Sequence, residues 1–263
     1  MQNFRKLEAS PLVSVLMEVR FSTVLSLANY IPEIQDKVRA DYPLFKKEVE
    51  QLIELDSNGL KIEKVDKFVF SSKDKASSFQ LTPNRLIFIT KKYGEFGSFR
   101  ERCERLLNDV AGVMKLGLYE RLGLRYSNCI KVEGDDDAGL KKLFSNHDSF
   151  FNPTLDDVGL KVNRKSDSLL KTGEGFLVIR SHLSMSNNIV FDDLGSQSYI
   201  EIKNDREASL RMLLDLDHFW ENKEEQVDFN VDEIIARLKR LHDSSRTAFW
   251  KVTSEYARSE VWR

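Results

Sequence analysis

Regular alternation of apolar and polar residues is the feature that most limits what this chain can fold into. Within residues 11–21, valine, methionine or phenylalanine occupies every second position from 13 onward, with Ser14, Glu18 and Arg20 among the residues between them. The stretches 118–132 and 210–220 show the same period. Because the side chains of a β-strand point alternately to two faces, each stretch predicts a strand with one buried face. We therefore expect a sheet that is apolar on one side and polar on the other.

Helical spacing of apolar residues occurs between these strands. Pro32 falls in the first turn of one such segment, and Tyr42 with Pro43 ends it. Helices are predicted at 29–41, 98–115, 138–144 and 230–241, and residues 243–256 either continue the last of these helices or bend into another. Further strands are predicted at 60–72, 78–90, 159–171, 175–185, 188–191 and 198–202, and their close spacing in the second half favours an antiparallel meander.

The order of these elements predicts an α+β protein with two sheet-and-helix halves. The first half, 1–133, is predicted as a ferredoxin-like unit of order β-α-β-β-α-β, with a middle hairpin that can be elaborated. Residues 134–158 are predicted as a linker with a short helix, and its acidic run 135–137 is interpreted as a solvated turn. The second half, 159–263, is predicted as an antiparallel sheet closed by C-terminal helices.

Composition narrows the class of protein. Forty Lys and Arg against 42 Asp and Glu give a formal charge of -2, so bulk charge argues against a nucleic-acid binder. No apolar run approaches the roughly 20 residues that span a bilayer, so no membrane association is expected. Cys103 and Cys129 lack the CxxC spacing of zinc sites. We therefore expect a cytoplasmic protein whose thiols stay reduced, with no metal and no cofactor.

Sequence motifs of known catalytic sites are missing. The segment Gly94–Gly97 is too short for a phosphate loop and has no following Lys-Ser or Lys-Thr pair. Neither a GxSxG nucleophile motif nor an HExxH zinc motif occurs. His218 shares the apolar face of its strand and is interpreted as a core residue, whereas His242 lies at the end of the 230–241 helix, where capping and ligand binding are both open.

Asp215 and Asp217 form the most suggestive acidic pair. They stand two residues apart on the strand LRMLLDLDHFW, so both point to one face, opposite Leu214 and Leu216. Paired carboxylates at this spacing suit metal ligation or two cationic partners. The alternative interpretation is an open, solvated sheet face.

Charged residues also alternate on two other strands. Glu18 and Arg20 belong to the first strand, and Arg125 belongs to the strand 118–132. If these strands are central neighbours, the three side chains form a polar cluster on the face away from the helices. An arginine on a central strand needs a partner. We favour an internal Glu18–Arg125 ion pair, and the alternative is a ligand surface in which Arg20, Arg125 and Arg180 hold an anion.

Four sequence signatures together resemble those of a sporadically distributed bacterial family of proteins of about this length with no assigned function. Ser14 stands where this resemblance leads us to expect an acidic residue. The signatures are PLxxV with E-x-RF, R-x-GLRY-x-N, LD-x-D and LH-x6-F, represented here by Pro11, Leu12, Glu18, Arg20, Phe21, Arg121, Gly123, Leu124, Arg125, Tyr126, Asn128, Leu214, Asp215, Asp217, Leu241, His242 and Phe249.

The patchy distribution of that family resembles that of accessory genes, which implies a role beside toxin–antitoxin or antiphage-defence cassettes. The leading hypothesis is a non-catalytic interaction protein, the neutralising or sensing component of such a pair, whose partner is a protein encoded by a neighbouring gene. One alternative is a metal-dependent phosphoesterase that uses Asp215 and Asp217, with His242 as an optional third ligand. The other is a sensor of an anionic ligand such as a nucleotide. The candidate site residues are Glu18, Arg20, Arg125, Arg180, Asp215, Asp217 and His242.

Overall fold

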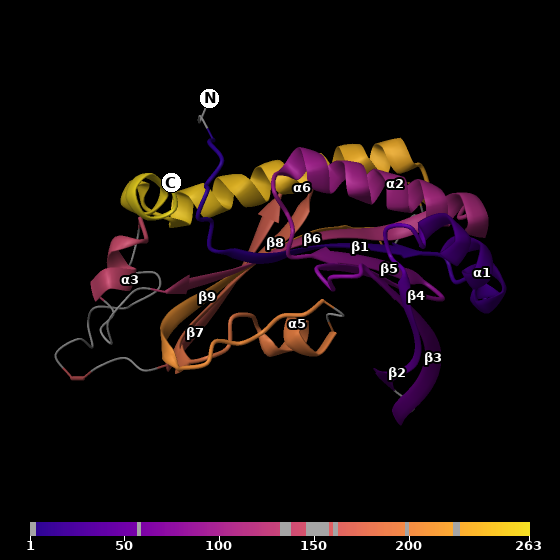
Figure 1. Cartoon of the computed structure of the whole chain (residues 1–263), viewed down its shortest axis with the longest axis horizontal. Helices are drawn as coiled ribbons and strands as arrows, with labels where there is room; N and C mark the ends of the chain where they lie inside the picture. The colour runs from indigo at the N-terminus through magenta and orange to yellow at the C-terminus, as the bar shows by residue number, and fades with distance from the viewer. Residues whose placement is uncertain are drawn as a thin grey trace.

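A computed structural model describes residues 4–56, 59–131, 138–145, 158–159, 163–197, 200–222 and 227–263, and the side chains of 51–63 and 195–197 are left out of the description. The protein is a mixed α+β structure built on one ten-stranded antiparallel sheet (Figure 1). The strand order is β2-β3-β4-β5-β1-β6-β9-β8-β7, and β10 pairs with the start of β6.

The strands are β1 Leu12–Phe21, β2 Leu44–Asp56, β3 Gly59–Ser71, β4 Ser77–Thr82, β5 Arg85–Thr90, β6 Leu118–Lys131, β7 Asn163–Thr172, β8 Gly175–Ser186, β9 Ser209–Glu221 and β10 Val227–Asp228. The helices are α1 Leu27–Val38, α2 Phe96–Met114, α3 Ala138–Lys142, α5 Asp192–Gln197 and α6 Val231–Val252, followed by a π-helical turn, Ala257–Val261. Within the described residues, no helix combines the length and the apolar character needed to cross a membrane.

Helices α2 and α6 lie on one face of the sheet, and α5 lies on the other, toward which the β2–β3 hairpin also bends (Figure 1). The alternation predicted for β6 explains this arrangement. Leu122 and Leu124 are fully buried beneath the helices, whereas Arg121 and Arg125 point to the opposite face. The sheet therefore separates an apolar, helix-covered side from a polar side.

The two longest helices use different signals at their ends. Asn230 caps α6 by accepting a hydrogen bond from the backbone N–H of Glu233 at 3.2 Å, and Asp232 and Glu233 place negative charge in the first turn. Helix α2 ends where Lys115 takes up a left-handed conformation with φ of 53°. The apolar stripes of both helices then pack into the same core beside β1 and β6.

Strands β6 and β9 join the two predicted halves into one sheet. Their pairing runs over eleven residue pairs, from Arg121 opposite Glu221 to Lys131 opposite Arg211. The apolar side of β9, including Met212, Leu214 and Leu216, is buried in a second core cluster that also contains Leu140 and Trp262. The predicted linker, 134–158, falls largely outside the described residues.

Three predictions about individual elements need correction. The strand β2 was not predicted, because this edge strand exposes apolar residues of both faces, among them the neighbours Leu44 and Phe45. The strand predicted at 188–191 is wrong: Val190 is buried by packing beside Ile89 on the polar side of the sheet, not by strand pairing. Of the two possibilities for 243–256, the structure has the continued helix α6, so His242 lies in the middle of a helix and not at the predicted end.

The predicted strand at 198–202 lies partly outside the described residues, and its described part, 200–202, is not a strand. Helix α5, just before it, was not predicted, and Leu194 on this helix is buried in the same third apolar cluster as Val190. A short helix of six residues leaves too little periodicity to detect in the sequence.

Gly175, after the β7–β8 turn, tests the close packing of β8 on β9. Its φ is +135°, and a β-carbon there would lie 2.2 Å from the carbonyl oxygen of Phe219. We expect Gly175→Ala to lower the free energy of unfolding by about 2 to 4 kcal/mol, because the backbone is strained and the strand must shift. A β-carbon at Gly173 in the same turn would have no atom within 4 Å, so Gly173→Ala should change the free energy of unfolding by less than about 0.5 kcal/mol. Urea unfolding measures both, and equal effects would contradict this packing.

Candidate functional site

The structure divides the candidate residues between the two faces of the sheet. Glu18, Arg20, Arg125, Asp215, Asp217 and Arg180 come from the neighbouring strands β1, β6, β9 and β8 and lie on the polar face. His242 reaches the opposite face from α6, where it contacts Tyr126. The sequence therefore predicted six residues of one polar surface and one residue of a separate site.

Four of the polar residues form a cluster that we call the arginine clasp: Arg125, Arg180, Asp193 and Asp215. The Asp215 carboxylate is fully buried and accepts hydrogen bonds from Nε of Arg125 at 2.9 and 3.0 Å. It also accepts from Nε and Nη2 of Arg180 at 3.0 and 2.7 Å. One buried carboxylate thus fixes two guanidinium groups from β6 and β8.

The outer ends of both guanidinium groups point to Asp193 on α5. Nη1 and Nη2 of Arg125 donate to its two carboxylate oxygens at 2.9 and 3.1 Å, and Nη2 of Arg180 donates to Oδ2 at 3.2 Å. Burial alone would raise the pKa of Asp193, but the hydrogen bonds and the charges of the two arginines outweigh it and lower the pKa. Asp193 therefore stays ionised at neutral pH.

The predicted Glu18–Arg125 ion pair is wrong. In the β1–β6 pairing Glu18 lies opposite Gly123, two residues from Arg125. Its Oε1 instead accepts from Nε of Arg20 at 2.9 Å and from Nε of Arg121 at 3.1 Å. The prediction that the polar face holds internal ion pairs is confirmed, but the sequence assigned the wrong partner because the strand register was not known.

The solvated face predicted around Asp215 and Asp217 also needs correction, because Asp215 has no exposed surface at all. Asp217 lies directly opposite Arg125 in the β6–β9 pairing, yet that arginine binds Asp215 on the diagonal. Burial is the main cause that raises the pKa of Asp217, and the nearby Arg125 charge opposes it.

The structure does not bring His242 to Asp215 and Asp217 as a third metal ligand. The two aspartates lie on the polar face, and His242 lies on the helix side. Among the parts of the chain that the structure describes, no three His, Cys, Asp or Glu side chains converge as metal ligands. His218 is the buried core residue that the sequence predicted, with its two ring nitrogens 2.9 Å from the carbonyl oxygen of Leu241 and from Oγ1 of Thr172.

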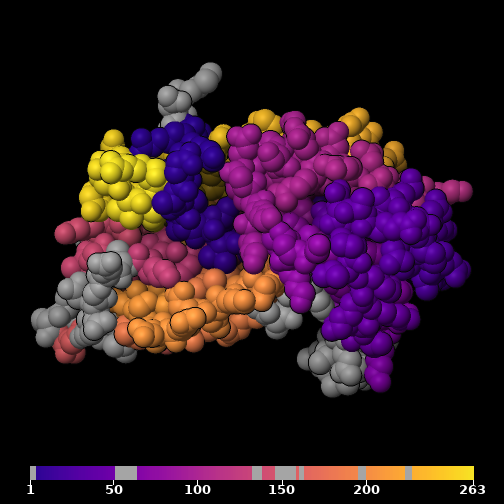
Figure 2. Space-filling model, in the orientation of Figure 1, coloured from indigo at the N-terminus to yellow at the C-terminus, as the bar shows by residue number. Residues whose placement is uncertain are grey.

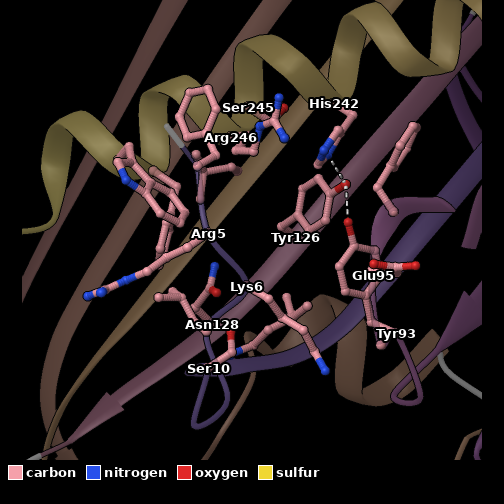
Figure 3. A pocket seen from close by; sticks show the side chains of 18 of the residues that line it. Arg5, Lys6, Ser10, Tyr93, Glu95, Tyr126, Asn128, His242, Ser245 and Arg246 are labelled. Atoms are coloured by element: carbon pink, nitrogen blue, oxygen red, sulfur yellow. Dashed lines mark hydrogen bonds between the residues drawn. The ribbon is translucent and has the colours of Figure 1, made fainter. Parts of the chain in front are cut away.

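A cavity of about 660 Å³ opens on the helix side of the sheet (Figure 3). Four segments line it: the N-terminal residues 4–12, the loop 91–97 after β5, strand β6 and helix α6. In the space-filling view the N-terminal segment lies on the surface between the C-terminal residues and the region of α2 (Figure 2). The aromatic rings in the wall are those of Phe4, Tyr93, Phe96, Tyr126, His242, Phe249 and Trp250.

A chain of polar groups runs along one wall of this cavity. The Tyr126 hydroxyl lies 2.7 Å from Nδ1 of His242 and 3.4 Å from the Tyr93 hydroxyl (Figure 3). The imidazole ring of His242 stacks on Phe96 with ring centroids 3.9 Å apart. Burial, and next the charge of Arg246, lower the pKa of His242 to about 4, while burial raises the pKa of Tyr93 to about 12. These groups are therefore uncharged at neutral pH.

Arg246 supplies positive charge on the same wall. Its guanidinium lies 4.1 Å from the ring centroid of Phe4 and donates to Oδ1 of Asp243 at 3.1 Å. Its Nε is buried and has no hydrogen-bond acceptor among the described residues. The same wall therefore carries a buried donor that no group in the described part of the chain satisfies.

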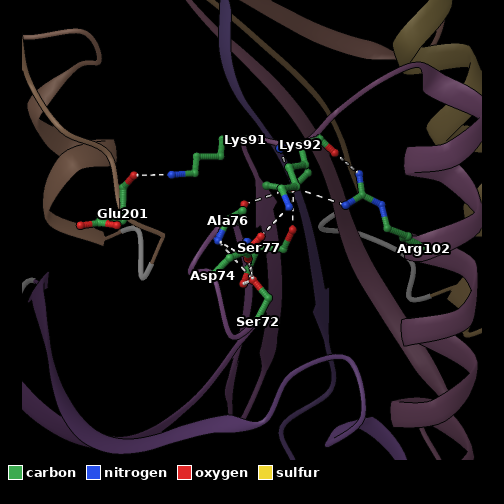
Figure 4. A network of polar contacts seen from close by, with 9 residues as sticks. Ser72, Asp74, Ala76, Ser77, Lys91, Lys92, Arg102 and Glu201 are labelled. Carbon is green, nitrogen blue, oxygen red and sulfur yellow. Dashed lines mark hydrogen bonds and ion pairs between the residues drawn. The ribbon is translucent and has the colours of Figure 1, made fainter.

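The loop at 91–97 is held in place by a polar network (Figure 4). Arg102 of α2 donates to the carbonyl oxygen of Lys92 at 2.6 Å, and Lys92 forms an ion pair with Asp74 in the β3–β4 turn. Lys91 donates to the carbonyl oxygen of Glu201 at 2.9 Å. Contacts to three separate segments thus fix the loop that carries Tyr93.

Sequence reasoning missed most of this cavity. Tyr93, Arg246 and Phe4 lie in segments that are far apart in the chain, and no spacing rule relates them. The signal that could have been used is the resemblance itself, because Tyr126, Asn128, His242 and Phe249 belong to its signatures and all line the cavity. The sequence matches no protein-family model and shows no significant similarity to a curated protein.

Arg125 tests the arginine clasp. We expect Arg125→Met to lower the free energy of unfolding by about 3 kcal/mol, because the buried Asp215 loses a charged partner. Adding Asp215→Asn should recover part of this loss, whereas adding Glu18→Gln should recover none. The control Arg105→Met removes only an exposed pair with Asp41 and should cost at most about 1 kcal/mol. Recovery by Glu18→Gln in urea unfolding would contradict this pairing.

His242 gives the protein a pH dependence with a defined sign. Its pKa is about 4 when folded and about 6.5 when unfolded, so below pH 6.5 the unfolded chain binds a proton that the folded protein does not. We expect the wild type to lose roughly 3 kcal/mol of stability through this group between pH 7 and pH 4. His242→Asn should lack that part of the loss, and the control His182→Asn should retain it. Equal pH slopes for wild type and His242→Asn would contradict the burial of a neutral imidazole.

Proposed function

We propose that this protein binds a small organic anion that carries an aromatic ring, and that the helix-side cavity is the binding site. The observation that carries the proposal is the convergence of aromatic rings and cations on one cavity of about 660 Å³. Cavities of this size hold small-molecule ligands, and aromatic walls favour flat, apolar groups.

The charges of the wall favour an anion. Four cationic side chains line the cavity against two carboxylates, so an anionic group gains attraction there. The guanidinium of Arg246 lines the cavity and would attract such a group by its charge. The cations are Arg5, Lys6, Lys91 and Arg246, and the carboxylates are Glu8 and Glu95.

The uncharged polar chain supports binding without catalysis, as the sequence-based hypothesis of a sensor or interaction protein has it. General acid–base catalysis works best with groups whose pKa lies near the operating pH. The pKa of His242 is about 4 and that of Tyr93 about 12, so both hydrogen-bond well but exchange protons poorly at pH 7. In this proposal Tyr126 and His242 orient the ligand, and Tyr93 and Phe96 contact its ring.

Several expectations from the sequence belong to the same proposal. The unpaired thiols of Cys103 and Cys129 support a cytoplasmic location. The strand order β4-β5-β1-β6 supports a ferredoxin-like unit elaborated by the β2–β3 hairpin, and α6 with the turn at 257–261 would close the second half. A protein partner from a defence or toxin–antitoxin pair rests on the resemblance alone.

Binding of nucleoside monophosphates, which join a flat aromatic base to an anion, tests the proposal. We expect isothermal titration calorimetry to detect binding of at least one of AMP, GMP, CMP and UMP, and weaker or no binding of the matching nucleoside and of inorganic phosphate. Arg246→Met should weaken binding by about tenfold or more, which corresponds to the loss of one charge-assisted hydrogen bond.

The control for this experiment is Arg105→Met, which removes the same charge from a helix on the same side of the sheet but lies outside the cavity. It should bind as the wild type does. Equal weakening by both variants would show that only the overall charge matters, and binding that survives Arg246→Met unchanged would place the ligand elsewhere.

A further inference from the structure

The arginine clasp has features that a purely structural ion pair does not need. Asp215 alone already gives each guanidinium a buried carboxylate, through Nε of Arg125 and through Nε and Nη2 of Arg180. The remaining ends of the guanidinium groups are directed outward, where they meet Asp193, whose side chain is 44% exposed. The outer half of the clasp therefore lies where a solute can reach it.

The geometry of this outer half is that of a carboxylate-binding site. Nη1 and Nη2 of Arg125 donate hydrogen bonds to the two carboxylate oxygens of Asp193 at 2.9 and 3.1 Å. This is the bidentate arrangement that arginine forms with carboxylates and phosphates. Nη2 of Arg180 reaches one of the same oxygens at 3.2 Å. Both arginines come from paired strands, so their positions are fixed before any ligand arrives.

The charge count distinguishes between these two anions. Two guanidinium groups and the Asp215 carboxylate leave one net positive charge when Asp193 is not counted, and the carboxyl group of Asp217 opposite Arg125 adds negative charge whenever it is ionised. A carboxylate neutralises this charge, whereas a phosphate dianion would leave an excess negative charge beside the buried Asp215. A carboxylate is therefore the better occupant.

An unsatisfied hydroxyl beside the clasp points the same way. The guanidinium of Arg180 lies 4.8 Å from the ring centroid of Phe191. The buried hydroxyl of Ser127, directly opposite Asp215 in the strand pairing, has no hydrogen-bond partner among the described residues. Internal pairing with Asp193 thus leaves hydrogen-bonding capacity unused on this face.

We propose that Arg125 and Arg180 form a carboxylate-binding site on the polar face of the sheet, which Asp193 occupies within the chain and which a carboxylate ligand occupies in its place. Rotation of the exposed Asp193 side chain is enough to vacate the site. The buried Asp215 stays in place in both states and keeps the two guanidinium groups aligned. This site is independent of the helix-side cavity, because the sheet lies between them.

Asp193→Asn tests this proposal, because it removes the internal competitor with little change in size. The probes are acetate, the capped peptide Ac-FDDL-NH2 with the sequence of residues 191–194, and inorganic phosphate, all at matched ionic strength. We expect the variant to bind the carboxylate probes about tenfold or more tightly than the wild type, as removal of a competing closed state requires. Phosphate should bind more weakly than either.

Acetate binding alone would identify a small free carboxylate as the ligand source, and tighter binding of the peptide would identify an acidic side chain of a partner chain. Asp192→Asn is the matched control, because it removes the same charge from the adjacent residue, whose carboxylate accepts a hydrogen bond from Asn188. It should bind as the wild type does.

Arg180→Met in the Asp193→Asn background should abolish the gained affinity while thermal unfolding confirms that the protein stays folded. The proposal is overturned if Asp193→Asn binds the carboxylates no better than the wild type, if Asp192→Asn gains as much affinity, or if phosphate binds best. It is also overturned if Arg180→Met leaves the gained affinity intact.

Discussion

The carboxylate of Asp215 is the constraint on which the rest of the structure depends. An ionised carboxylate with no exposed surface is strongly unfavourable unless cations and hydrogen bonds compensate it, and here two arginines do so. One of them comes from β6 and the other from β8, while Asp215 itself lies on β9 between them. The pairing therefore fixes the register of three strands, because a shift of one residue would move Asp215 into the apolar core.

This register also connects the two faces of the protein. Arg125 and Ser127 point to the polar side, so Tyr126 and Asn128 between them must point to the helix side, where both line the cavity. The same strand thus contributes to the arginine clasp and to the proposed ligand site. In the signature that contains these residues, Arg125 therefore stabilises the sheet on the polar face, whereas Tyr126 and Asn128 line the cavity on the other face.

The predictable part of the fold follows from side-chain periodicity. The alternation on β1, β6 and β9 correctly predicted these strands and the division between an apolar and a polar face. Each of these strands buries one face in the core and directs polar side chains to the other face. Strand β2 could not be predicted, since its exposed residues do not have to alternate between apolar and polar. The apolar residues Ile189 and Val190 led to the wrong prediction of a strand, because they pack against the sheet without pairing with it.

The charged residues of the polar face could be selected from the sequence, but the ion pairs that they form could not. Nothing in the sequence shows that Arg125 binds Asp215 and Asp193, because partners on a sheet depend on register and on the strand order β6-β9-β8. The metal-site alternative grouped His242 with Asp215 and Asp217, from which the sheet separates it. Its true neighbours, Tyr126 and Phe96, come from a strand and a helix start that only the folded chain brings together.

The central claim is that the helix-side cavity, with His242 in its wall, receives the ligand. The most direct measurement is a titration of protein carrying 15N-labelled histidine with AMP, followed by the ring nitrogen signals in NMR spectra. The account predicts that the signals of His242 shift with saturation while those of His182, whose ring lies 6.3 Å from the ring of Phe191 on the polar side, stay in place. Shifts at His182 with none at His242 would contradict it.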